Sequence, residues 1–161
     1  MADLLNTNSN ATNYGDDAIV TLSPREHIRL RPGMYVGVVG DGSQPDEALY
    51  VLIKEVVDNS IDEFIMGAGR QIDITLADNV VTVRDYGRGI PLKSLAAAVG
   101  QMNTGGKYGG DAFKKTVGLN GVGVKAVNML SEEFTARSVR DGEARTVTFA
   151  KGLEVSDRWE S

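Results

Sequence analysis

Glu55-Val56-Val57-Asp58-Asn59-Ser60-Ile61-Asp62-Glu63 is the stretch that decides the fold, because it places four carboxylates and one amide inside an otherwise apolar run. A helix with about 3.6 residues per turn would gather the apolar side chains on one side and the acidic ones on the other. The side expected to face the core carries Leu49, Leu52, Ile53, Val56, Val57, Ser60, Ile61 and Phe64. The opposite side carries Glu55, Asn59 and Asp62.

The acidic side of this helix has few basic partners. After Lys54 there is no Lys or Arg until Arg70, whereas a solvated helix face usually alternates acids with bases four residues away. Two interpretations therefore stay open, a solvated acidic face and a binding site.

Composition narrows the class of protein. The chain has 161 residues, of which 42% are hydrophobic and 24% charged, as expected for one soluble globular domain. It has no cysteine and a single histidine, His27, which excludes disulfides, cysteine-based zinc sites and histidine-rich metal sites. No apolar run is long enough to cross a membrane and no secretory signal is visible, so we expect a cytoplasmic protein with no membrane partner.

The net charge is -5. Nonspecific affinity for nucleic acid depends on clustered Lys and Arg. We therefore expect any contact with DNA to lie outside this chain.

The N-terminal part of the sequence predicts an arm followed by a short helix. Residues 1–18 are polar and are expected to form a flexible arm, in which Tyr14, with Ile19 just beyond, is able to dock on another surface. Ser23-Pro24-Arg25-Glu26 has the form of a capping box with proline at the first helical position. It predicts a helix that ends near Leu30.

Turn residues bound the central helix. Met34 to Gly37 is expected to be a short extended piece, and Gly40 to Pro45 a loop. Pro45 and Asp46 are expected to open the central helix, and Gly67 and Gly69 to close it.

An alternating pattern then predicts a hairpin. Residues 72–76 and 80–84 alternate with period two around the turn Ala77-Asp78-Asn79. The second strand delivers Asp85 to the end of the sheet. A glycine-containing loop and a short helix from Leu92 to Met102 are expected to follow.

The rest of the chain predicts a long loop, a helix and two strands. Residues 103–116 are polar and glycine-rich, which favours a functional or disordered loop, and residues 124–130 have a helical pattern. Strands 134–139 and 145–149 are expected to pair through an Asp-Gly turn. The order of elements predicts an α+β fold, a mixed and largely antiparallel sheet with helices on one face, formed by residues 19–161.

Three stretches of the sequence contain residues that could bind a ligand or take part in catalysis. The glycine run from Gly118 to Gly123 precedes a helix, where backbone N–H groups and the helix dipole favour a phosphate, although a plain strand-to-helix turn fits as well. Asp85 at a strand end can accept a hydrogen bond from the amine of adenine, although an Asx turn is the simpler alternative. The amide oxygen of Asn59 suits Mg²⁺, and Glu55 one turn earlier could deprotonate a water.

Together these pieces resemble a known family. The sequence is similar to the ATP-binding domain of the GHKL superfamily, and within it to the B subunits of bacterial type IIA topoisomerases, DNA gyrase and topoisomerase IV. The motifs that carry the resemblance are Arg31-Pro-Gly-Met-Tyr35, Glu55 to Glu63, Asp85-Tyr-Gly-Arg-Gly-Ile-Pro91, Gly105-Gly-Lys-Tyr108 and Gly118-Leu-Asn-Gly-Val-Gly123. Mismatch-repair proteins, heat-shock chaperones and sensor histidine kinases share the Asn and glycine motifs but lack the first and fourth of these five.

The resemblance implies a role for each matching residue. Glu55 would be the general base, Asn59 the magnesium ligand and Asp85 the acid that binds adenine. The positions implied to bind ATP are Asn59, Glu63, Asp85, Arg88, Gly89, Ile90, Pro91, Lys107, Gly118, Leu119, Asn120, Gly121, Val122 and Gly123. Asp85, Arg88, Pro91 and Arg140 fall where inhibitors of the family bind. Lys107 also has a simpler interpretation as a solvated charge on a loop.

The resemblance also implies partners. The N-terminal arm would reach a second copy of the same chain, and an A-type subunit and DNA would bind regions outside this chain. The family continues beyond the position of Ser161 with a strand and a second domain that supplies a lysine to the γ-phosphate. We therefore expect this chain to bind nucleotide better than it hydrolyses it, and a non-hydrolysing nucleotide- or inhibitor-binding fragment stays as the alternative.

Overall fold

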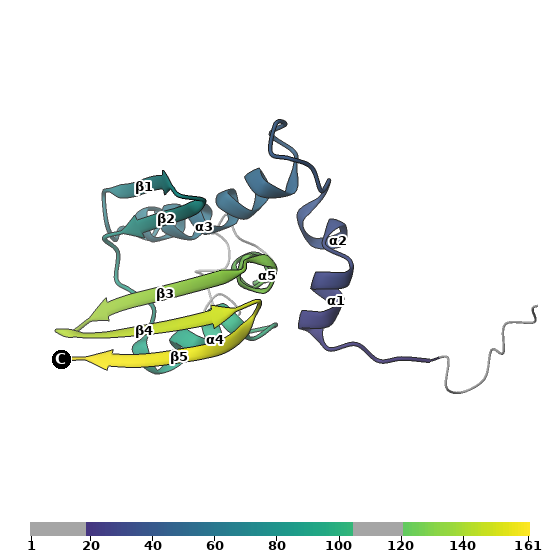
Figure 1. The fold of residues 1–161 in the computed structure, drawn as a ribbon. Coiled ribbons are helices and arrows are strands. Elements are labelled where there is room, and N and C mark those ends of the chain that lie inside the picture. The colour runs from purple at the N-terminus through teal and green to yellow at the C-terminus, as the bar shows by residue number, and fades with distance from the viewer. Residues whose placement is uncertain (1–18, 105–120) are drawn as a thin grey trace, which may run out of the picture.

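The computed structural model describes residues 19–104 and 121–161. Within them helices combine with antiparallel strands, which confirms the α+β prediction (Figure 1). The elements, in chain order, are α1 (Pro24–Leu30), α2 (Gly33–Val36), α3 (Ala48–Ile65), β1 (Ile72–Ala77), β2 (Val80–Asp85), the 3₁₀ turn η2 (Leu92–Ser94), α4 (Leu95–Gly100), α5 (Gly123–Leu130), β3 (Glu133–Arg140), β4 (Glu143–Ala150) and β5 (Leu153–Glu160).

Helix α1 begins at the predicted capping box. The Glu26 amide donates to the Ser23 hydroxyl oxygen at 3.3 Å, and the Ser23 amide donates to the Glu26 carboxylate at 2.9 Å. The extended piece predicted after it is wrong, because residues 33–36 form the single helical turn α2. Pro32 has helical backbone angles, and its carbonyl accepts from the Val36 amide at 3.0 Å while Val36 is buried. A proline already in the helical region starts this turn.

Helix α3 is the predicted central helix, but its buried side differs from the prediction. It begins at Ala48, slightly later than expected. Its most buried residues are Asp58, Ser60 and Asp62, and Asp62 was expected on the exposed side. The apolar residues near its two ends, Leu49 and Phe64, are 48% and 61% exposed. Helix α5 and strand β2 pack against α3, and the packing buries polar residues in the middle of the helix while these apolar residues near its ends stay exposed.

Strands β1 and β2 form the predicted hairpin. Their register pairs Ile72 with Asp85 and Ala77 with Val80. Asp78 and Asn79 both have positive φ, 51° and 60°, as the turn types that match strand twist require. The hairpin therefore ends β2 at Asp85, as predicted.

Strands β3, β4 and β5 form a second antiparallel sheet, in that order. The Asp141-Gly142 turn joins β3 and β4 as predicted, with φ of 54° and 85°. The strand β5 was missed by the sequence reasoning. Its alternating positions carry the charged Asp157 between Val155 and Trp159, which interrupts the apolar pattern that identifies a half-buried strand.

The core lies between the second sheet and two helices. Leu95 and Val99 of α4 pack with Val147 and Phe149 of β4, and Val124, Phe134 and Ala136 pack around them. Helices α4 and α5 cover one face of the β3–β5 sheet, and α3 lies beside the β1–β2 hairpin (Figure 1). Among the described strands the hydrogen bonds define two sheets, where one was expected. No helix in the described ranges is long and apolar enough to cross a membrane.

Candidate functional site

Asp85 lies where β2 ends, and its carboxylate is held by two internal bonds. One oxygen accepts from the Gly87 amide at 2.9 Å, and the other accepts from the Ser60 hydroxyl of α3 at 3.4 Å. The residue is exposed. A fixed, accessible carboxylate of this kind can accept a further hydrogen bond from a ligand amine.

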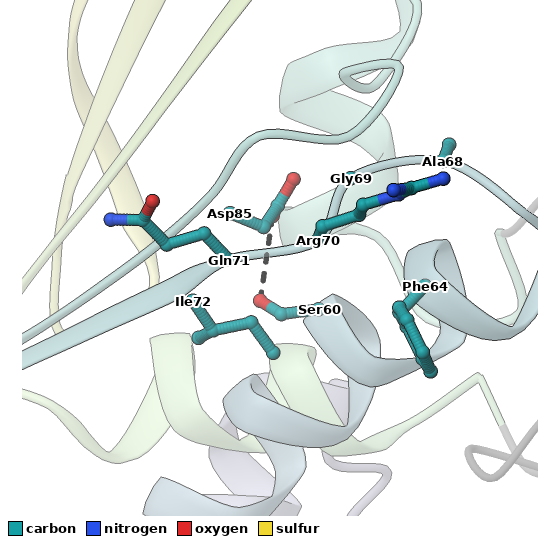
Figure 2. A pocket seen from close by; sticks show the side chains of 8 residues that line it. All are labelled: Ser60, Phe64, Ala68, Gly69, Arg70, Gln71, Ile72 and Asp85. Atoms are coloured by element: carbon teal, nitrogen blue, oxygen red, sulfur yellow. Dashed lines mark hydrogen bonds between the residues drawn. The ribbon is translucent and has the colours of Figure 1, made fainter.

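A cavity of about 200 Å³ opens at this carboxylate. Figure 2 shows Ser60 and Asp85 pointing toward each other from α3 and from the end of β2. The lining consists of Ser60, Phe64, Ala68, Gly69, Arg70, Gln71, Ile72 and Asp85. Sequence reasoning assigned Ser60 only to the core side of the helix, and its contact with Asp85 depends on the packing of α3 against β2.

An ion pair joins α3 to the loop after Asp85. The Arg88 guanidinium donates to both carboxylate oxygens of Glu63, at 3.0 and 2.8 Å, and the Arg88 amide donates to the same carboxylate at 3.0 Å. The bond to Glu63 raises the pKa of Arg88 above its usual value. Glu63 and Arg88, two of the positions that the resemblance implies in ATP binding, are therefore in contact, and they fix the start of the loop to the central helix.

Glycines bring this loop close to its neighbours. A Cβ at Gly87 would lie 2.9 Å from both the Asp85 carboxylate and the Glu63 side chain. Gly89 has φ of +72°, and a Cβ there would lie 2.7 Å from the Val139 carbonyl oxygen and 2.8 Å from the Ser138 hydroxyl. The loop can approach β3 this closely only with glycine at position 89.

We expect Gly89→Ala to lower the free energy of unfolding by about 2–3 kcal/mol, because it combines a left-handed backbone with a collision against backbone atoms. Gly142→Ala is the matched control, since Gly142 has φ of +85° and open space around it, and it should cost only about 1 kcal/mol. Urea unfolding of the two variants measures the difference. Equal costs would show that the contact with β3 is unimportant.

The end of the loop brings two predicted inhibitor-site residues together. Ser138 donates its hydroxyl to the Ile90 carbonyl at 2.8 Å, and Arg140 lies 3.5 Å from the Gly89 carbonyl. A second cavity, of about 260 Å³, is lined by Pro91, Leu92, Lys93, Arg140, Asp141, Glu143 and Trp159. Pro91 and Arg140 therefore share one cavity, while Asp85 lines the other.

Glu55 and Asn59 lie on another part of α3, next to the start of α5. The carboxylate of Glu55, which is half-buried, occupies the space beside Gly123 so closely that a Cβ there would collide with it. Gly123 is the first residue of α5, where backbone N–H groups point outward. Asn59 is exposed, and its amide nitrogen donates to the Glu55 carbonyl at 2.6 Å. That bond turns the nitrogen end of the amide toward the helix and orients the oxygen end away from that carbonyl.

Several predicted site residues lie outside the described residues. They are Lys107, Gly118, Leu119 and Asn120, together with the arm of residues 1–18. Gly121, Val122 and Gly123 are described: Gly121 has φ of +60° and Val122 caps α5. The end of the predicted phosphate-binding run therefore does enter a helix, beside Glu55.

Proteins similar in sequence to this chain include subunits of DNA topoisomerase 4 and DNA gyrase. The B subunit of DNA topoisomerase 4 from Borreliella burgdorferi is 55% identical over 146 residues, which cover 91% of this chain and 24% of that protein. The B subunit of DNA gyrase from Rickettsia conorii is 42% identical over 153 residues, covering 89% of this chain and 18% of that protein. The chain thus spans about a quarter or less of the length of these curated relatives.

A solved structure and a family model give results consistent with these relatives. A crystal structure of the ATPase and transducer domains of DNA topoisomerase II from Balamuthia mandrillaris has a TM-score of 0.76 and 23% identity, over 90% of this chain and 45% of that one. This similarity establishes a shared fold. Residues 44–154 match the family of histidine kinase-, DNA gyrase B- and HSP90-like ATPases. Because that match spans more than half of the 161 residues, this chain belongs to the histidine kinase-, DNA gyrase B- and HSP90-like ATPase family.

Proposed function

We propose that this chain is the ATP-binding module of the B-type component of a bacterial type IIA topoisomerase. In the whole protein it would couple ATP binding, dimerisation and hydrolysis to the passage of one DNA duplex through another. The observation that carries the proposal is the exposed Asp85 carboxylate, which two internal hydrogen bonds hold at the edge of a cavity. Identity of 55% to the B-type component of a DNA topoisomerase 4 supports the choice of class.

The adenine end of the site would lie at Asp85. An acceptor-only carboxylate can bind the exocyclic amine of adenine, whereas the carbonyl oxygen of guanine would be repelled. The loop that borders this end contains Arg88, Gly89, Ile90 and Pro91. The ion pair between Arg88 and Glu63 joins this loop to α3. The same loop with Arg140 would hold inhibitors that compete for the site.

The phosphate end would lie at the start of α5. Gly121, Val122 and Gly123 present backbone N–H groups and the positive end of the helix dipole, which favour phosphate oxygens. Lys107, Gly118, Leu119 and Asn120 would complete it from the part of the chain that is not described. The proposed adenine end thus contacts α3 at Ser60, and the proposed phosphate end lies beside Glu55 of the same helix.

Mg²⁺ fits the donor set at Asn59. The amide oxygen is a hard neutral ligand, of the kind that Mg²⁺ combines with phosphate oxygens and water. When bound, the ion would neutralise phosphate charge. Glu55, one turn away and beside the start of α5, would orient and deprotonate the attacking water.

The remaining partners are proposed for the whole protein. A second copy would bind through the arm of residues 1–18, and an A-type subunit and DNA would bind elsewhere, in the cytoplasm. The net charge of -5 supports DNA contacts outside this chain. Two alternatives remain, a fragment that binds nucleotides or inhibitors without hydrolysis, and another ATPase of the same superfamily.

Calorimetric titration tests the proposal. The chain is titrated with a non-hydrolysable ATP analogue and Mg²⁺, and in parallel with the matching GTP analogue. Saturable binding that prefers adenine by about tenfold or more is expected, because a fixed carboxylate discriminates between an amine and a carbonyl. Absence of binding by folded protein, or equal affinity for the two bases, would refute the proposal.

A further inference from the structure

Arg145 of β4 is a buried charge that lies outside the nucleotide site described above. It is 8% exposed, and four hydrogen bonds occupy its guanidinium. Two go to the Asp157 carboxylate of β5, at 2.9 and 2.8 Å. The other two go to the backbone carbonyls of Leu92 and Lys93, at 2.6 and 3.1 Å. One side chain therefore joins two strands to the segment that follows the Gly87–Pro91 loop.

The carbonyls of Leu92 and Lys93 continue a row of backbone carbonyls that each have a polar partner. Those of Gly89 and Ile90 face Arg140 and Ser138 of β3, and that of Pro91 accepts from the Ser94 amide at 2.9 Å. Arg145 holds the next two. Each carbonyl from position 89 to position 93 thus has a partner, and the side chains among these partners come from the three-stranded sheet. In Figure 1 the connection from β2 to α4 runs past the end of this sheet.

The burial of Arg145 calls for a geometric explanation. Burying a guanidinium is costly, and an apolar side chain of similar volume is often equally good or better for stability. A planar guanidinium, however, can bind a carboxylate through one edge and two carbonyls through another, which no other side chain does. Asp157 fixes the plane of the group, and the Trp159 ring lies 5.0 Å from it.

The loop needs such an anchor because of its composition. Between Asp85 and Pro91 it contains two glycines, which leave the backbone many conformations. Glu63 holds the loop at Arg88, near its start. Ser138 and Arg140 of β3 contact the carbonyls of Ile90 and Gly89, and Arg145 binds the segment that follows Pro91.

We propose that Arg145 is a positioning residue, which fixes the Gly89–Lys93 segment against the second sheet and so sets the shape of the site beside Asp85. The inference rests on the proposed function, because it assigns this loop to the adenine end. Arg145 itself lines neither of the two cavities. It acts through the carbonyls of Leu92 and Lys93.

The test compares Arg145→Met with Arg137→Met. Arg137 is the matched control, since it lies on the neighbouring strand β3 in an exposed ion pair with Glu160 and touches no part of the loop. The affinities for the non-hydrolysable ATP analogue and the GTP analogue are measured by calorimetry, with Mg²⁺, at a temperature where each variant is folded. Amide hydrogen exchange of residues 88–95 is measured on the same samples.

Arg145→Met should weaken binding of the ATP analogue about tenfold and reduce the preference for adenine, because a loosened loop no longer fits the base. Exchange at residues 88–95 should rise. Arg137→Met should stay within about twofold of the unsubstituted chain in both measurements. Loss of global stability alone would weaken both nucleotides equally and would leave the preference unchanged.

Arg145→Lys serves as a second variant if Arg145→Met does not fold. A lysine keeps the charge but cannot bind the carboxylate and both carbonyls together, so an intermediate loss of preference is expected. The inference is refuted if the variant that folds binds the ATP analogue as tightly as the unsubstituted chain, or loses affinity for both analogues equally. If the unsubstituted chain binds neither analogue, the proposed function fails and this inference fails with it.

Discussion

Asp85→Asn is expected to weaken binding of the ATP analogue about 100-fold, because a charge-assisted hydrogen bond is lost and a donor takes the place of an acceptor. In the unsubstituted chain both carboxylate oxygens accept, one from the Gly87 amide and one from the Ser60 hydroxyl. An asparagine has a single oxygen. If that oxygen stays with the Gly87 amide, its NH₂ group faces the position of the adenine amine, where two donors oppose each other.

Asp73→Asn is the matched control for this experiment. Asp73 lies one strand away on β1, and its carboxylate accepts from Gln71 and Tyr86. It pairs with Arg84 in the hairpin register and so lies on the opposite face from Asp85. The control should bind the ATP analogue within about twofold of the unsubstituted chain. Similar losses in the two variants would mean that the hairpin, and not the Asp85 carboxylate, determines affinity.

In the whole protein, Glu55→Gln is expected to lower the rate of ATP hydrolysis by about 10²–10⁴, the usual contribution of a general base. The affinity for the ATP analogue should change by no more than about twofold, since glutamine keeps the size of the side chain beside Gly123 and removes only its ability to take a proton. Phosphate release at saturating ATP and Mg²⁺ gives the rate, and calorimetry gives the affinity.

Glu132→Gln provides the comparison for Glu55. Glu132 lies beyond the other end of α5, in an exposed ion pair with Lys151. Its substitution should leave both the rate and the affinity unchanged. A Glu55→Gln variant that hydrolyses ATP within about tenfold of the unsubstituted rate would exclude Glu55 as the general base. A variant that loses affinity for the ATP analogue instead would show that Glu55 contributes to nucleotide binding before the reaction.

Local signals predicted the elements of secondary structure well. The capping box at Ser23 started α1, and the alternation of residues 72–76 and 80–84 gave the hairpin with its positive-φ turn. These predictions succeeded because each depends on residues only a few positions apart. The prediction of an extended piece at Met34–Gly37 was wrong, because a proline already in helical geometry started a helical turn that the residue types alone did not indicate.

Long-range packing decided what the local pattern left open. The periodicity of α3 predicted which residues lie on the same side, but which of them are covered depends on how α5, β2 and other elements pack against the helix. Asp62 is therefore buried while Phe64 is exposed. The strand β5 was missed for a related reason, since its Asp157 pairs with Arg145 of the neighbouring strand, a contact that the local pattern does not indicate.

The sequence by itself determined the α+β class, the order of most elements, the end of β2 at Asp85 and the helix that carries Glu55 and Asn59. Periodicity, caps and turns act over a few residues, so these features can be recognised from the chain alone. Only the tertiary structure decided that Ser60 reaches Asp85, that Glu55 lies beside Gly123, and that Arg145 holds the segment after Pro91. These contacts join residues between 25 and 68 positions apart, and their geometry depends on how separate elements pack against one another.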